Sequence, residues 1–348
     1  MRQRTRYSLL LIFALLAALA VALILRKNAP PEVARLLPES DAILYFDLKP
    51  IRLATRFDRS PVAHSPDYQR FIDATGIVFE RDLDAVALSL HRMDDPDGPN
   101  GPVAYSEVFE GRFDGTRLAR YLASIAAARE SYAGHTIYTI PIFDSAVLLP
   151  TSGTKPTRYL RVTQLGYDTL AASNTPTAEQ IHSILDRYRA SASPFAGSSL
   201  LEARYRDVPL LSSAWAIGYI GLPFSENGHI TAFGLQLPMP EDTTFVASLR
   251  FTTAIHLRID EILPNEAAAE QSTQALTALL NLFRSFQDLQ FNLHRSGGEP
   301  LSQDAVLHQA IDSIKIQQQK DRTILTAVLP LDLLKQLTNA SASSSTQP

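Results

Sequence analysis

The chain has 348 residues, of which 45% are hydrophobic and 20% are charged, a composition typical of a globular protein with a sizeable core. Residues 1–27 contain five basic and no acidic side chains, so the remainder of this chain of net charge −4 carries −9. An acidic body excludes the basic surface that nucleic-acid binding requires. The absence of cysteine excludes disulfides, thiolate catalysis and cysteine-based zinc sites.

The first element is an apolar segment that follows a short tail, residues 1–6. Residues 7–25 carry no charge, and at about 1.5 Å per residue they nearly span a hydrocarbon core of about 30 Å. We therefore expect a transmembrane anchor over residues 7–26. A cleaved signal peptide is the alternative, but the small residues that precede a cleavage site are missing after the apolar run. A short tail before a large body favours an inner-membrane protein with its body on the extracytoplasmic side.

Residues 27–37 contain Pro30 and Pro31 and are predicted to form a stalk. The stretch DAILYFDLKP, residues 41–50, then alternates as a strand does. Its more apolar face carries Ala42, Leu44 and Phe46, and we expect that face to be the buried one. A related stretch, WAIGYIGLP, begins at residue 215 and aligns Tyr45 with Tyr219 at an offset of 174.

The first lobe is expected over residues 38–190. Period-two patterns predict strands over residues 82–92 and 103–113, with further strands within 135–150 and 158–173. A helix is predicted from Asp114, whose side chain can cap it. A second helix is predicted over residues 175–189, where Thr177 and Gln180 have capping-box spacing.

A linker over residues 191–207 leads to a second lobe over residues 208–338. Residues 244–262 alternate without a break and predict one long or bent strand with a wet face. A long helix capped by Asn265 follows, then a strand over 288–295 and a strand or hairpin over 314–330. Residues 339–348 lack apolar side chains and are expected to be disordered.

These elements favour an α+β fold with antiparallel sheets and helices on one face. The similar order of elements in the two halves further predicts two pseudo-repeated lobes behind one N-terminal transmembrane helix.

Side chains that could carry chemistry are scattered. No two of the eight histidines lie within ten residues of each other, and the Asp-rich stretch 94–101 lacks the oxygen ligands of a calcium loop. We expect no catalytic residue, no metal and no cofactor. The remaining candidates are Tyr45, Trp215 and Tyr219. Packing beneath a helix is the simpler explanation for these aromatic residues, and a ligand or partner groove between the lobes is the alternative.

An N-terminal anchor, a Pro-rich stalk and the stretch LLPESDAILYFDL, residues 36–48, together resemble the start of bacterial membrane-anchored envelope proteins grouped as domains of unknown function. The resemblance implies a membrane-tethered, extracytoplasmic body without an established activity. The leading hypothesis is therefore an extracytoplasmic binding or scaffolding module of a bacterial envelope, with another envelope protein as its partner. Two alternatives stay open: an envelope hydrolase built from scattered His, Asp and Glu, and a carrier of an apolar ligand held between the lobes.

Overall fold

The computed structural model describes residues 29–59, 64–143, 158–190, 197–219, 229–232, 235–238, 243–295 and 309–330. The strands are β1 (Ala42–Asp47), β2 (Leu83–Arg92), β3 (Val103–Gly111), β4 (Ala128–Tyr132), β5 (His135–Ile142), β6 (Arg158–Gln164), β7 (Thr169–Ser173), β8 (Ala214–Tyr219), β9 (His229–Ala232), β10 (Leu235–Pro238), β11 (Thr244–Phe251), β12 (Ile255–Ile262), β13 (Lys315–Gln319) and β14 (Arg322–Leu329). The α-helices are α2 (Glu32–Arg35), α3 (Leu48–Thr55), α4 (Pro66–Thr75), α5 (Phe79–Asp82), α6 (Gly115–Ile125), α7 (Glu179–Arg189), α8 (Ser199–Arg204) and α9 (Glu266–Arg295).

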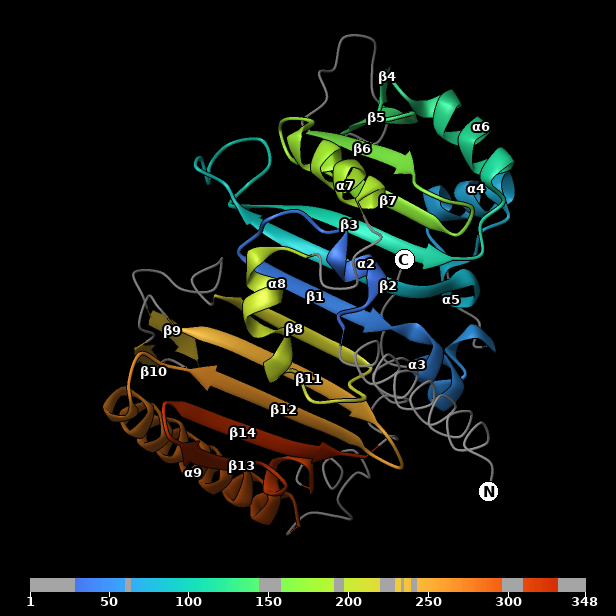
Figure 1. The fold of residues 1–348 in the computed structure, drawn as a ribbon. Coiled ribbons are helices and arrows are strands. Elements are labelled where there is room, and N and C mark those ends of the chain that lie inside the picture. The colour runs from blue at the N-terminus through green and yellow to red at the C-terminus, as the bar shows by residue number, and fades with distance from the viewer. Residues whose placement is uncertain are drawn as a thin grey trace, which may run out of the picture.

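One twelve-stranded sheet runs through the molecule in the order β13-β14-β12-β11-β8-β1-β2-β3-β7-β6-β5-β4 (Figure 1). Every neighbouring pair in it is antiparallel, and β9 and β10 form a separate pair. The prediction of an α+β fold built on antiparallel sheet is therefore confirmed. Because β1 pairs directly with β8, the two halves of the chain share one continuous sheet.

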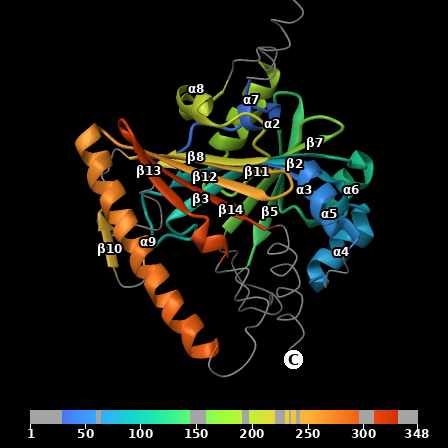
Figure 2. The ribbon, with the colours of Figure 1, turned by 90° about the horizontal axis from the view of Figure 1, so that it is seen from below.

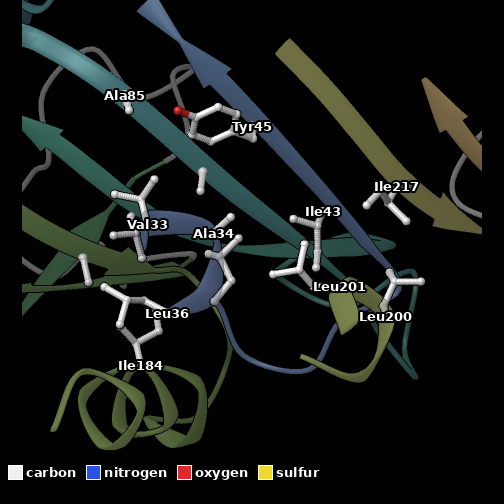
Figure 3. Packing of buried hydrophobic residues seen from close by; sticks show 14 of the residues in the cluster. Val33, Ala34, Leu36, Ile43, Tyr45, Ala85, Ile184, Leu200, Leu201 and Ile217 are labelled. Atoms are coloured by element: carbon white, nitrogen blue, oxygen red, sulfur yellow. The ribbon is translucent and has the colours of Figure 1, made fainter. Parts of the chain in front are cut away.

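One face of the central strands, which we call the covered face, lies beneath α2, α7 and α8 (Figures 2 and 3). Ile43 of β1 and Ile217 of β8 face each other across the strand pair and are fully buried there. Leu201 of α8 and Ile184 of α7 pack into the same cluster. The prediction that Leu44 and its neighbours form the buried face was wrong, because the helices cover the alternate residues.

Two segments assigned to connections belong to the core. In the predicted stalk, residues 32–37 include α2, and Val33 and Leu36 are buried against the covered face. In the predicted linker, α8 buries Leu200 and Leu201. Short helices between prolines or serines leave little periodic signal, yet each supplies apolar side chains to the centre of the sheet.

Helices also lie on the opposite face, which corrects the expectation of helices on one face only. At one end of the sheet, α4 and α6 pack over a second core cluster that includes Leu118, Leu122 and Val162. At the other end, α9 packs against β13 and β14, where Thr273 and Thr323 share a hydrogen bond of 3.0 Å. Figure 2 shows these two groups of helices at opposite ends of the sheet.

Two of the three predicted helix caps are confirmed. Asp114 accepts hydrogen bonds from the backbone N–H groups of Thr116 (3.1 Å) and Arg117 (3.0 Å) at the start of α6. Asn265 accepts one from the N–H of Ala268 at the start of α9. The capping box predicted at Thr177 is not formed, because α7 begins only at Glu179 with Ala178 as its N-cap.

The second half departs from its predicted elements in two places. The alternating stretch 244–262 is a hairpin, since β11 ends at Phe251 and pairs with β12 from Ile255 onward. The predicted strand 288–295 is instead the last part of α9. Of the two alternatives left open for residues 314–330, a strand or a hairpin, the structure has the hairpin, formed by β13 and β14.

The predicted anchor at residues 7–26 and the predicted tail at 339–348 lie outside the described residues. Within the part that the structure describes, no helix combines the length and apolar character of a membrane span.

Candidate functional site

Two of the three candidate residues meet at the centre of the covered face. Tyr45 of β1 lies opposite Trp215 of β8 in the strand register, and their rings stack with centroids 5.4 Å apart and planes inclined by 27°. Side chains directly opposite each other in an antiparallel pair share one face of the sheet, which is why these rings meet. Both are buried, Trp215 with only 3% of its surface exposed.

A third ring completes the cluster from outside the sheet. Tyr205, in the turn Tyr205–Asp207 after α8, packs edge-on against Trp215 with centroids 5.4 Å apart. Asp207 accepts a hydrogen bond of 2.9 Å from Arg322 of β14, which fixes this turn against the sheet. Tyr205 was not among the predicted site residues, because it falls in the segment that was expected to be a linker.

A cavity of about 340 Å³ adjoins the cluster. Its wall consists of Tyr205, Arg206, residues 208–212 and Trp215. Leu210 and Leu211 are exposed, with 66% and 83% of their surface accessible. The volume lies at the lower end of the range for small-molecule sites, and a mostly apolar wall with a few polar groups is typical of them.

The polar atoms of the two aromatic wall residues have no acceptor in the part of the chain that the structure describes. Neither the Tyr205 hydroxyl nor the Trp215 indole N–H makes a hydrogen bond to a residue that the structure describes. Burial raises the pKa of Tyr205, so its hydroxyl stays protonated and can donate. Two donors beside a cavity that bond to no described residue can bond to a ligand group that carries acceptor oxygens.

Tyr219 lies apart from this cluster. It is at the other end of β8, four residues or about 13 Å from Trp215 along the strand, and 44% of its surface is exposed. Tyr45 does not line the cavity either, because it packs behind Trp215. Of the predicted groove residues, the structure therefore brings Tyr45 and Trp215 together and leaves Tyr219 outside.

A buried polar network is the arrangement nearest to catalytic chemistry. His91 Nε2 lies 3.0 Å from Ser106 Oγ and 3.2 Å from Ser89 Oγ, and Ser106 donates to Ser173 Oγ at 3.0 Å. All three serines are fully buried. The pKa of His91 is lowered by its burial, although the charge of Asp41 acts in the opposite direction. The His91 ring bonds to the backbone of Glu39 and to no carboxylate of a described residue. A serine nucleophile needs an accessible hydroxyl and an oriented base, so this network ties β2, β3 and β7 together without a reactive group.

The other histidines of the hydrolase alternative have separate partners. His64 lies 3.5 Å from Glu80, His135 bonds to the Gln164 carbonyl and His256 to Thr252. In the described part of the chain, no three His, Asp or Glu side chains gather as a metal site would require.

Comparison with known proteins adds little. No family model and no curated protein matches the chain. Crystal structures of TP0453 align with it at low similarity: form I at a TM-score of 0.40 and 10% identity, covering 90% of this chain and 98% of that one. Form III aligns at a TM-score of 0.41 and 11% identity, covering 91% and 99%. Values this low support no conclusion about fold or function.

Proposed function

We propose that the chain is a binding module of a bacterial envelope, held in the inner membrane by residues 7–26 with its body on the extracytoplasmic side. The uncharged stretch 7–25 supports the anchor. The cavity beside Trp215 supports binding, because two donors in its wall, the Tyr205 hydroxyl and the Trp215 indole N–H, make no hydrogen bond to a described residue. This last observation carries the proposal.

The wall of the cavity defines the chemistry of its ligand. Tyr205 and Trp215 supply hydrogen-bond donors, and the exposed Arg206 supplies a positive charge. Val208, Pro209 and the two leucines supply apolar surface. We infer a small ligand with an apolar body and an acidic or carbonyl head, presented to the module by the envelope or by a partner protein there.

The division into two related lobes is also a proposal. Outward from the pair of Ile43 and Ile217, one side of the sheet runs β1, β2, β3, β7, β6 and the other runs β8, β11, β12, β14, β13. In the large sheet, each half has three strands, then a helix (α6 or α9), then a closing hairpin, and the separate pair β9–β10 is an addition of the second half. This order supports duplication, and β4 and β5 are the additions of the first half. Superposition of the halves in an experimental structure should place Tyr45 on Tyr219.

Trp215 is the only tryptophan of the chain, so its fluorescence reports on the cavity. We would titrate the full-length protein in phosphatidylcholine nanodiscs with octanoate, and with octylamine as the charge-reversed control. Octanoate is expected to change the fluorescence to saturation. Tyr205→Phe should weaken binding about tenfold, because a hydrogen bond to a charged acceptor contributes about 1.5 kcal/mol. Tyr219→Phe removes the same atom from an exposed tyrosine and should have no effect.

An equal response to octylamine, or no saturable response to octanoate, would reject the cavity as the binding site. The membrane orientation is tested separately by a C-terminal reporter that is active only outside the cytoplasm. Activity of a reporter that requires the cytoplasm would reject the extracytoplasmic body.

A further inference from the structure

The second face of the central sheet is almost wholly apolar. We call it the apolar face, and it consists of the side chains of β2, β1, β8, β11 and β12 that alternate with those of the covered face. Its half-buried apolar members are Val86, Leu88, Leu90, Leu44, Phe46, Ala216, Phe245, Ala247, Leu249, Leu257 and Ile259. None of these residues belongs to either core cluster. The charged Arg92 and Glu261 lie on the same face at the ends of β2 and β12. Across four interstrand spacings the face is about 19 Å wide.

The helices of the apolar face stand at its ends. α4 and α6 cover the strands from β3 to β5, and α9 covers β13 and β14. Helix α3 also contacts β2 and β11, and Figure 2 shows no other described helix over the strands between these two groups. The apolar face therefore lies between two groups of helices. We call the face the floor, α4 and α6 the first wall, and α9 the second wall.

One ionisable side chain lies where the floor meets the first wall. Glu107 of β3 is opposite Leu88 of β2 and Ala172 of β7, so its carboxyl shares the apolar face with both. Among the described residues it has no hydrogen bond and no ion pair. Burial alone raises the pKa of Glu107 to about 7.

The charged and titratable groups near Glu107 are few. Tyr105, two residues earlier on the same face, is affected by the charge of Glu107 and by that of Arg158 on β6. The neighbours from β2 and β7 are apolar. A carboxylate without a counter-charge on an apolar surface is unfavourable. A cation that carries an aliphatic chain would neutralise the carboxylate and also cover the apolar surface.

We propose that the apolar face binds an amphiphilic amine, with its aliphatic chain on the floor between α6 and α9 and its ammonium group against Glu107. Charge complementarity selects this occupant over a neutral or acidic amphiphile, since no cation pairs with Glu107 among the described residues. The site is independent of the cavity beside Trp215, which lies on the other side of the sheet and favours an acceptor head group.

Photocrosslinking tests this site directly. The full-length protein in phosphatidylcholine nanodiscs at pH 8 is irradiated with a diazirine-bearing dodecylamine, and in parallel with the corresponding dodecanol. Peptide mass spectrometry then locates the label. We expect the amine to label β1, β2, β8 and β11 at least fivefold more than the alcohol does.

Glu107→Gln should reduce labelling by the amine to the level of the alcohol while leaving the alcohol unchanged. Glu110→Gln, on the same strand but facing the covered face, is the matched control and should retain the preference. Trp215 fluorescence checks that each variant is folded. Lowering the pH to 5 protonates Glu107 and should abolish the preference in the wild-type protein.

Equal labelling by the two probes in the wild-type protein would overturn the proposal. So would a preference for the amine that survives in Glu107→Gln, or a label located away from the apolar face. Because the readout is the position of the label, none of these results bears on octanoate binding at the cavity.

Discussion

Along β2, the two faces of the central sheet invert the usual relation between hydrophobicity and burial. The covered face of this strand carries Ala85, Ala87 and Ser89, which are at most 6% exposed. The apolar face of the same strand carries Val86, Leu88 and Leu90, which are only half-buried. Small and polar residues let α2 approach the sheet closely, whereas the large side chains lie outside both core clusters of the described residues. A sheet face that is more apolar than its own packing requires is typical of a surface that binds something else.

The largest expected difference between the two faces is the loss of stability when one large apolar side chain on each face is truncated to alanine. Ile43→Ala on the covered face removes a fully buried side chain and is expected to cost about 3 to 4 kcal/mol. Leu88→Ala on the apolar face should cost about 1 kcal/mol, because Leu88 is already partly solvated. Urea unfolding of the full chain, followed by Trp215 fluorescence, measures both. Equal costs would mean that the two faces are equally packed.

Glu107 predicts a dependence of stability on pH. Its folded-state pKa of about 7 lies above the ordinary value of 4.5, so between these values the folded state binds more protons than the unfolded state. The free energy of unfolding should therefore fall as pH rises from about 4.5 to 7, by at most about 3 kcal/mol, and less because the carboxyl keeps some solvent contact.

Glu107→Gln should remove most of this dependence of the unfolding free energy on pH. Glu110→Gln should remove less, since Glu110 is less deeply desolvated and its raised pKa is offset in part by Lys49. If the unfolding free energy of Glu107→Gln depends on pH as strongly as that of the wild-type protein, the Glu107 carboxyl does not have a pKa raised by burial. The comparison uses urea unfolding at a series of pH values.

The smallest expected effects come from substitutions at the start of one helix on each face of the sheet. Asp114→Ala removes the cap of α6 on the apolar side and should cost about 1 kcal/mol. Thr177→Ala, before α7 on the covered side, should change stability by less than about 0.5 kcal/mol, because its side chain caps nothing. A loss of 1 kcal/mol from Thr177→Ala would indicate that its predicted capping box forms in solution.

The sequence predicted elements well where a long periodic pattern met a clear boundary. Strands β2 and β3 and helix α6 with its Asp114 cap are of this kind. The turn at residues 252–254 lacks glycine and proline, so two strands in continuous alternation looked like one. The stretch 288–295 contains too few residues to distinguish a strand from the end of a long helix.

The candidate site was predicted only in part. Tyr45 and Trp215 were found through the similarity of two strands, but only the register of β1 with β8 shows that they stack. Tyr205 and Arg206 reach the cavity through a tertiary contact that no sequence spacing encodes. Hydrophobicity also misidentified the buried face, because burial depends on where the connecting helices pack and not on the strand alone.

The claim that this body is a binding module is tested most directly by native mass spectrometry of the full-length protein, extracted from its source membranes under mild conditions. We predict a population whose mass exceeds that of the polypeptide by that of a small apolar or amphiphilic molecule, and which is lost on solvent denaturation. A protein that appears only at the mass of its polypeptide, under conditions that preserve known lipid complexes, would contradict the account.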